Sequence, residues 1–505
     1  MSTVQSIDPA TGQIVEKIEP TTPEQVAELC RVASDAAAGL EALGRSGRAV
    51  LLRAVSDELE ARREEIVELG RRETALPEAR LNGELTRTAY QARLFAEVLD
   101  DGGYLEAAVD HAGDTPMGPG PDLRRMLVPT GPVAVFGASN FPLAFSVPGG
   151  DTVSALAAGC PVVVKAHSSH PALSRLTYEA LVAAAGRAGA PAGTVGIVYG
   201  TEAGAALVAD PAITAVGFTG SLSGGNALME IIGRREVPIP FFGELASLNP
   251  VVVTEGAAAA RPAEIAEGLV TSVTGSGGQL CTKPGLVFVP AGDAGDAVVS
   301  TAVERVGGAA AAVLLNARIS TSYDAIADEL SAQPGVRVIA EGGQPGGDGF
   351  GVTPRLLEVD AEQLAAVGIG ECFGPTTVLV RYRADDESAT VRALAGLPPS
   401  LTGTVHSGPG ETELVRRLTA ALRPRAGRLL YDGWPTGVLV SWAQHHGGPW
   451  PSTNTQHTSV GTTAIRRWLR PVTWQNAPVD VLPEELRDET RSVPRRIDGR
   501  LELPV

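Results

Sequence analysis

Residues 271–289 read T-S-V-T-G-S-G-G-Q-L-C-T-K-P-G-L-V-F-V, and they place a single cysteine, Cys281, between a glycine-rich run and an apolar run. The apolar run after Gly285 predicts a β-strand. Glycines permit backbone conformations that other residues avoid, and they let N–H groups approach a reacting atom closely. A thiol on such a turn is a candidate nucleophile, although most free cysteines are small, buried and inert.

On the N-terminal side of this segment, strand and helix patterns alternate. Three helices are expected first, the second near 45–72 and the third near 76–99. Apolar runs then predict strands at 132–136, 161–165, 194–199, 212–218, 238–242 and 250–253. This alternation predicts an α/β fold with a parallel sheet covered on both faces, and a second α/β region is expected after Cys281.

Ligands of open α/β sheets bind at the carboxyl ends of the strands. The polar residues and glycines that follow the predicted strands are therefore candidate site residues. They are Asn140, Lys165, His167, Ser168, Thr219, Gly220, Ser221 and Glu244.

Composition narrows the class of function. The 505 residues include 41 basic and 58 acidic ones, a net charge of −17, which disfavours binding to nucleic acid or to an anionic membrane. The four cysteines are far apart and form no C-x-x-C pair, so neither a disulfide framework nor a metal site is expected. Neither a secretory signal nor an apolar run of about 18 residues is evident, which predicts a cytoplasmic protein without membrane spans.

Six motifs in order resemble the aldehyde dehydrogenase superfamily, and the resemblance covers nearly the whole chain. They are S-N-F-P with Asn140, V-V-V-K with Lys165, G-F-T-G-S at 217–221, G-E-L with Glu244, G-G-Q-L-C with Cys281, and E-C-F-G-P at 371–375. Each motif is weak alone, and their order makes the signal specific.

The resemblance implies a Rossmann-type NAD(P)-binding domain, a catalytic α/β domain and a small oligomerisation extension. We expect residues 1–120 and 132–249 in the first and 250–440 in the second. The extension is expected at 121–131 and 470–505, with 441–469 returning to the cofactor-binding domain. Members of this family are usually homodimers or homotetramers.

The family chemistry implies a role for each matching residue. Cys281 is expected to add to the aldehyde, Asn140 and the Cys281 backbone N–H to bind the resulting oxyanion, and Glu244 to activate the hydrolytic water. Expected cofactor contacts come from Lys165, Gly220, Ser221, Glu371 and Phe373. Taken singly, Asn140 could be a turn residue, Lys165 and Glu244 surface charges, and Ser221 an ordinary helix cap.

Departures from the common family pattern point to one branch. Glu244 is followed by L-A-S-L-N-P, and the tail reads H-H-G-G-P-W-P-S-T at 445–453. These resemble α-ketoglutaric semialdehyde (2,5-dioxopentanoate) dehydrogenases and the NADP-dependent fatty aldehyde dehydrogenase of luminous bacteria. Ser168 stands where NAD-preferring members commonly carry a glutamate, so NADP is expected to be accepted or preferred alongside NAD.

Several alternatives stay open at this stage. The first substrate candidate is α-ketoglutaric semialdehyde, and the runner-up is a medium- or long-chain aliphatic aldehyde. Arginines near Cys281 would favour the first and an apolar tunnel the second, but the sequence does not say which arginine would bind a carboxylate. His446 is either near the substrate mouth or an ordinary loop residue. A catalytically silent binding protein, or one that retains only thioester hydrolysis, is the competing class.

Overall fold

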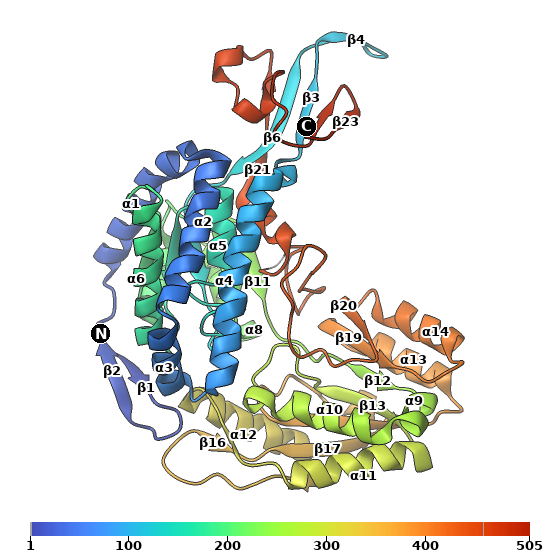
Figure 1. The fold of residues 1–505 in the computed structure, drawn as a ribbon. Coiled ribbons are helices and arrows are strands. Elements are labelled where there is room, and N and C mark those ends of the chain that lie inside the picture. The colour runs from blue at the N-terminus through green and yellow to red at the C-terminus, as the bar shows by residue number, and fades with distance from the viewer. Residues whose placement is uncertain (1–2, 458, 505) are drawn as a thin grey trace.

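The computed structural model describes residues 3–457 and 459–504. Two α/β units lie side by side, and a smaller sheet projects away from both (Figure 1). The predicted α/β class is confirmed.

Five parallel strands form the sheet of the first unit, in the order β11-β10-β7-β8-β9. Their bounds are β7 Val133–Phe136, β8 Val162–Lys165, β9 Val195–Val198, β10 Ala215–Thr219 and β11 Phe241–Glu244. The chain runs outward from β7 to β9 and then returns to β10 on the other side of β7. This reversal opens a crevice beyond the carboxyl ends of β7 and β10, where open α/β sheets bind ligands.

Helices cover both faces of this sheet. On one face α5 Gly150–Ala158 and α6 Pro171–Arg187 lie against the strands, and an outer layer of α2 Gly44–Ala61, α3 Arg63–Thr74 and α4 Glu78–Asp101 packs on these two helices. The other face packs against α1 Pro23–Ala42, α7 Thr201–Ala209 and α8 Leu222–Gly233. Because the strands are buried on both sides, they are almost entirely apolar.

The single helix expected at 45–72 is two helices. Arg62 has φ −105° and ψ 17°, outside the helical region, and it separates α2 from α3. The bend turns the buried side of α3, with Ile66, Val67 and Gly70, toward α4 and α6. Helical periodicity alone could not show this change of direction, because both helices bury apolar residues at the same spacing.

The second unit has a seven-stranded sheet in the order β15-β17-β18-β13-β12-β19-β20, in which only β15 runs antiparallel to its neighbour. The strands are β12 Val251–Val253, β13 Leu286–Pro290, β15 Arg337–Glu341, β17 Arg355–Asp360, β18 Thr376–Tyr382, β19 Ser400–His406 and β20 Ala426–Tyr431. The helices are α9 Glu255–Ala260, α10 Pro262–Thr274, α11 Asp293–Gly307, α12 Ala317–Ala332, α13 Glu387–Gly396 and α14 Thr412–Leu422. Separate apolar clusters fill the two faces of the sheet.

The projecting sheet has the order β21-β6-β3-β22-β23. Its strands are β3 Ala107–Asp110, β6 Leu123–Pro129, β21 Leu469–Gln475, β22 Arg495–Ile497 and β23 Arg500–Glu502. It therefore combines the segments expected for the extension with β3, which comes from the range expected for the first domain. Large apolar side chains are exposed on and around it at Met117, Val479, Val481, Leu501 and Leu503.

Short elements complete the chain: β1 Val4–Ile7, β2 Ile14–Ile18, β4 Gly113–Thr115, β5 Gly118–Gly120, β14 Ala312–Val313 and β16 Gly351–Val352. The segment expected to be helical at 462–469 is the 3-10 helix η4 Thr462–Trp468, which packs on α5. Other 3-10 turns are η1 Gly103–Leu105, η3 Leu364–Ala366, η5 Val479–Val481 and η6 Glu484–Leu486. Among the described residues, no helix combines the length and apolar character that crossing a membrane requires.

Candidate active site

Cys281 lies on a loop whose path depends on glycine. The 3-10 helix η2 (Gly275–Gly278) follows α10 and has positive φ at Ser276, Gly277 and Gly278. A Cβ atom at Gly278 would lie 2.3 Å from the carbonyl group of Gly374, so no side chain fits there. This close approach brings the motif that contains Cys281 against the motif E-C-F-G-P.

The side-chain amide of Asn249 fixes the backbone around the cysteine. It donates to the carbonyl oxygens of Cys281 at 2.8 Å and of Lys283 at 3.0 Å. Its own oxygen accepts the Ser247 hydroxyl at 2.7 Å. Asn249 is buried and has φ of 51°, a left-handed conformation that asparagine tolerates better than most residues. Our sequence reasoning did not single out Asn249, although it lies in the unusual L-A-S-L-N-P segment after Glu244.

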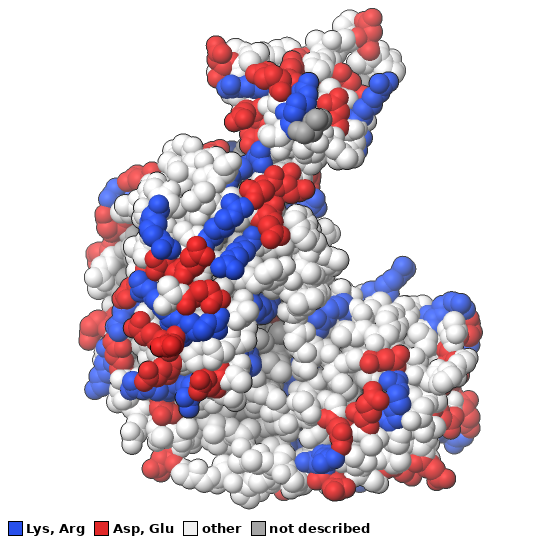
Figure 2. Space-filling view, in the orientation of Figure 1, with Lys and Arg blue, Asp and Glu red and all other residues white. Residues whose placement is uncertain are grey.

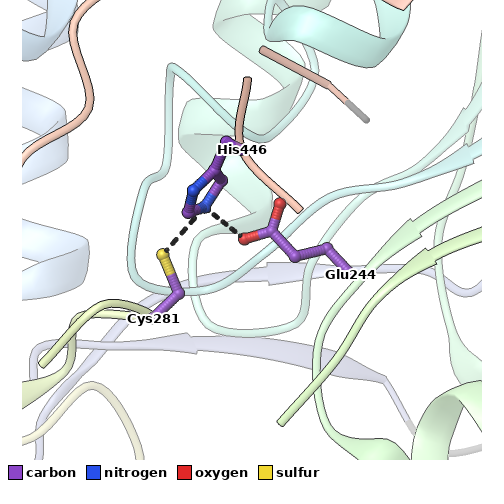
Figure 3. A group of neighbouring side chains, drawn as sticks. All are labelled: Glu244, Cys281 and His446. Atoms are coloured by element: carbon purple, nitrogen blue, oxygen red, sulfur yellow. Dashed lines mark hydrogen bonds and ion pairs between the residues drawn. The ribbon is translucent and has the colours of Figure 1, made fainter. Parts of the chain in front are cut away.

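Three side chains meet at the thiol (Figure 3). His446 Nε2 lies 3.5 Å from Cys281 Sγ and 2.8 Å from Glu244 Oε1. His446 is fully buried and Glu244 is 5% exposed, and His446 Nδ1 and Glu244 Oε2 have no hydrogen-bond partner among the described residues. A single imidazole nitrogen therefore faces both the nucleophile candidate and the carboxylate. It can accept a proton from the thiol when unprotonated and donate to the carboxylate when protonated.

The loop that carries His446 is held against β11, the strand that carries Glu244. The Leu245 backbone N–H donates to the Ser452 carbonyl at 2.8 Å, and Glu244 forms an isolated antiparallel bridge with Thr453. The Gly243 N–H donates to the Asn454 side chain at 2.7 Å. These bonds fix the histidine and the carboxylate relative to each other, while the cysteine comes from the second unit.

The surroundings of Cys281 disfavour its ionisation. Burial raises the pKa of the Cys281 thiol well above its usual value, and the negative charge and hydrogen bond of Glu244 raise it further. A thiolate is the nucleophilic form, so the proton has to be removed when the substrate arrives. His446 Nε2 is the basic nitrogen in contact with the sulfur.

Asn140 follows β7 and reaches the same loop. Its Nδ2 donates to the Gln279 carbonyl at 2.8 Å, and the side chain is 7% exposed. An amide nitrogen carries two hydrogens, so this bond orients the group and leaves one hydrogen free. The arrangement can bind an oxyanion that forms beside Cys281.

A cavity of about 680 Å³ lies between the two units, next to the thiol. It is lined by these predicted site residues: Asn140, His167, Ser168, Thr219, Gly220, Ser221, Glu244, Cys281, Glu371 and Phe373. Lys165 and His446 are not among the lining residues, although His446 Nε2 lies 3.5 Å from Cys281 Sγ. Ser221 caps α8 by accepting from the Gly224 N–H at 3.2 Å, so the first turn of a 12-residue helix faces the cavity. Helix N-termini bind phosphate through free N–H groups, so a dinucleotide fits here.

Two charged groups near this cavity are perturbed by burial. Burial lowers the pKa of the Lys165 ammonium to about 8. Burial raises the pKa of Glu371 to about 7, opposed by a hydrogen bond from the Ser247 backbone and by the charge of Lys283. Both groups therefore change charge near neutral pH, as is common at ligand sites.

The sequence did not predict the contacts of His446 or the position of Arg318. His446 was expected near the substrate mouth or as a loop residue, and the structure places it between Cys281 and Glu244. Its signal was the H-H-G-G-P run, which gave no indication of partners 165 and 202 residues away. Arg318 also lines the cavity, and none of the six motifs contains it.

The sequence predicted no metal site. The donor atoms of Glu244, Cys281 and His446 all lie within 4.8 Å of one another, so these three residues could hold a transition metal. The hydrogen-bonded arrangement also fits proton transfer without a metal.

Comparisons with known proteins agree on one family. The model of the "Aldehyde dehydrogenase family" matches residues 1–448. A protein of Azospirillum brasilense named α-ketoglutaric semialdehyde dehydrogenase 2 is 44% identical over 99% of this chain and 96% of its own length. An α-ketoglutaric semialdehyde dehydrogenase of Acinetobacter baylyi is 41% identical over 87% of this chain and 84% of its own length. The solved structure of a Thermus 1-pyrroline-5-carboxylate dehydrogenase with bound NAD superposes with a TM-score of 0.80 at 21% identity, covering 94% of this chain and 90% of that one, a likeness of fold.

Proposed function

The chain belongs to the aldehyde dehydrogenase family, and from this premise we propose that it oxidises α-ketoglutaric semialdehyde to 2-oxoglutarate. The family resemblance read from the six motifs is confirmed, and with it NAD(P)-dependent aldehyde oxidation. The observation that carries the choice of substrate is the 44% identity, over nearly the full chain, to a protein named for that semialdehyde.

We assign the two α/β units different tasks. Residues 1–120 and 132–249 would bind NAD(P), with 441–469 returning to them, and 250–440 would supply the nucleophile. NAD(P) supplies the acceptor for the hydride that leaves the substrate carbon. The cavity between the units supports this division, because the thiol borders it and the N-terminus of α8 faces it.

The first step is the attack of the thiol. His446 Nε2 takes the proton from Cys281 as sulfur bonds to the aldehyde carbon, which gives a tetrahedral thiohemiacetal. The negative charge that develops on the aldehyde oxygen is bound by the free hydrogen of Asn140 Nδ2 and by the Cys281 backbone N–H. One such donor is typically worth about 2.7–4 kcal/mol of transition-state stabilisation.

Hydride loss leaves a thioester on Cys281, which water must hydrolyse. Glu244 is the general base in this step, and it reaches the water directly or through His446, whose Nε2 lies 2.8 Å from its carboxylate. The proton returns to the sulfur as the acid leaves. One hydrogen-bonded chain therefore serves both halves of the reaction.

The surroundings of Ser168 support acceptance of NADP. Ser168 is exposed to the cavity, and the positive charges of Lys165 and Arg318 act on the neighbouring His167. A hydroxyl at this position can donate a hydrogen bond to a 2′-phosphate, whereas a carboxylate would repel it. We therefore propose that NADP is used at least as well as NAD.

Glu371 predicts a pH dependence of cofactor binding. We propose that its carboxylate accepts hydrogen bonds from the nicotinamide ribose, and with a pKa of about 7 it is protonated on the acidic side. Lowering the pH from about 7.5 to about 6 should then raise the KM for NAD(P) by up to about tenfold, since hydrogen bonds to charged groups are worth ~1.5–3 kcal/mol. KM values across this range test it, with Glu371→Gln as the comparison. A variant with the same pH profile as the parent enzyme would contradict the assignment.

The projecting sheet supports self-association. Its exposed apolar side chains, with Val479, Val481 and Leu501 among them, lie on an extension that projects away from both α/β units (Figure 1). We propose a homodimer or homotetramer in which this extension contacts a neighbouring copy, and we place the enzyme in the cytoplasm.

A spectrophotometric panel tests the proposed reaction. Formation of reduced nicotinamide is measured with α-ketoglutaric semialdehyde, pentanal and decanal, each with NAD and with NADP. We expect kcat/KM for the semialdehyde to exceed that for either aliphatic aldehyde by at least ~10-fold. A higher value for decanal would favour a fatty aldehyde substrate, and a tenfold preference for NAD would contradict the role of Ser168. If the protein hydrolysed esters but did not reduce the cofactor, only the hydrolytic half of the proposed reaction would remain.

A further inference from the structure

Two arginines from different units converge on one loop near the catalytic centre. Arg87, on α4, donates its Nε–H to the carbonyl of Val438 at 3.1 Å. Arg428, on β20, donates to the carbonyls of Gly437 at 3.2 Å and of Pro435. The segment 435–438 is therefore held between the two guanidinium groups.

Neither guanidinium has an acidic partner among the described residues. Arg87 donates otherwise only to Gln91, at 3.4 Å, and both arginines are absent from the ion pairs that other arginines form. Arg87 Nη2 and Arg428 Nε are buried and have no acceptor. A buried cation with an unpaired N–H is unfavourable unless an anion joins it.

The nearest acid on α4 is already in use. Glu84 pairs with Arg80, and its other oxygen accepts the backbone N–H groups of Leu143 and Ala144 at 2.9 and 2.8 Å. The remaining donor capacity of Arg87 is therefore available to a ligand.

Each arginine is connected to the reacting cysteine by a short series of contacts. Arg428 on β20 pairs with Thr402 on β19, whose hydroxyl donates to Asn249 Oδ1 at 3.1 Å, and the Asn249 amide donates to the Cys281 carbonyl at 2.8 Å. The Arg87 guanidinium lies 5.0 Å from the ring centre of Phe145, and the Phe145 ring lies 6.3 Å from that of His446, which contacts Cys281. Burial lowers the pKa of Arg87, and the negative charges of Glu84, Cys281 and Glu244 oppose that shift. Burial likewise lowers the pKa of Arg428, and the charge of Cys281 opposes it. Figure 2 shows acidic and basic side chains interspersed over the outer helices, the projecting sheet and the second unit, while mostly uncharged side chains border the hollow between the units.

We propose that Arg87 and Arg428 together bind the carboxylate of the substrate. The inference rests on the proposed function and adds the residues that select an aldehyde bearing a carboxylate. Two guanidinium groups offer enough donors for both carboxylate oxygens, and the planar donor fork of arginine suits that geometry. Both groups are anchored by hydrogen bonds to carbonyls of the loop 435–438. An uncharged aldehyde of the same length gains nothing from this pair.

The test compares two aldehydes of equal carbon count, 5-oxopentanoate and pentanal, together with α-ketoglutaric semialdehyde. The variants are Arg87→Met and Arg428→Met, which keep the apolar stem, and Arg87→Lys, which keeps the charge. Arg93→Met is the matched control, because Arg93 is an exposed arginine on the same helix, paired with Asp57. Initial rates give kcat and KM for each aldehyde with a saturating cofactor.

We expect the ratio of kcat/KM for 5-oxopentanoate to that for pentanal to fall ~10- to 100-fold in each Met variant. The change should lie mainly in KM, and Arg87→Lys should recover part of it. Arg93→Met should keep the parent ratio. Equal losses for both aldehydes, or an unchanged ratio, would overturn the inference and show that the arginines only support the loop.

The proposed function has a separate outcome in the same experiment. If kcat/KM of the unaltered enzyme for pentanal equals its kcat/KM for the two carboxylate-bearing aldehydes, the proposed substrate is wrong whatever the variants do. If it prefers the carboxylates and the Met variants keep that preference, the substrate stands and the assignment to Arg87 and Arg428 is wrong.

Discussion

Replacing Cys281 with alanine should lower kcat for aldehyde oxidation by about 10⁴-fold or more, because no covalent adduct can form. Without the thiohemiacetal the aldehyde carbon does not readily release hydride, so the cofactor site cannot compensate for the loss. The Cys281 sulfur would also be the nucleophile in the hydrolysis of an ester substrate. Cofactor-independent esterase activity should therefore disappear together with oxidation.

The measurement is steady-state reduction of NAD(P) and esterase turnover on the same preparations. Cys30→Ala is the matched control, because Cys30 is a buried thiol on the core-facing side of α1, and burial raises its pKa to about 12. That variant should keep the activity of the parent. Undiminished turnover in Cys281→Ala would refute the mechanism as a whole.

Glu244→Gln should lower kcat by about 10²- to 10⁴-fold while leaving the first half of the reaction intact. The thioester then accumulates, so rapid mixing should show a burst of reduced cofactor close to one equivalent per active site, followed by a slow steady rate. A variant without a burst would place Glu244 in the attack of the thiol and not in hydrolysis.

The same substitution should change the acidity of the thiol. Burial raises the pKa of Cys281 most, and the carboxylate of Glu244 raises it further, so removing the negative charge should lower that pKa. The pH profile of Cys281 alkylation should move toward lower pH in Glu244→Gln. His446→Asn provides the contrast: it removes the nitrogen 3.5 Å from the sulfur and should slow the burst itself.

The sequence was sufficient to predict the α/β class, because the strands are short apolar runs separated by helical periods. It also indicated where a site would be: Asn140 follows β7, Lys165 ends β8 and Glu244 ends β11. The strand expected at 238–242 lies at Phe241–Glu244, so Glu244 belongs to the strand itself. Proline residues at 238 and 240 delay the start of pairing, since they cannot donate to a ladder.

Long-range contacts could not be predicted in this way. The bonds of His446 depend on how the loop after β20 lies on β11, through backbone groups of Leu245 and Ser452 that carry no sequence signal. The position of Arg87 beside Phe145 likewise depends on the packing of α4. The sequence pattern shows that this segment is a helix, but it does not show how the helix is rotated about its own axis. Local periodicity fixes which face of an element is buried, and only tertiary packing decides which residues it meets.

The meeting of Cys281 from one unit with Glu244 and His446 held on the other has a consequence for modularity. Neither unit contains all three side chains by itself, because the proposed nucleophile lies in one unit and its proposed proton acceptor is held on the other. If the cofactor-binding unit were moved alone into another protein, it would carry the base without the thiol. If the catalytic unit were moved alone, it would carry the thiol without the base. The two units therefore have to be inherited, or transferred in engineering, together with the interface that joins them.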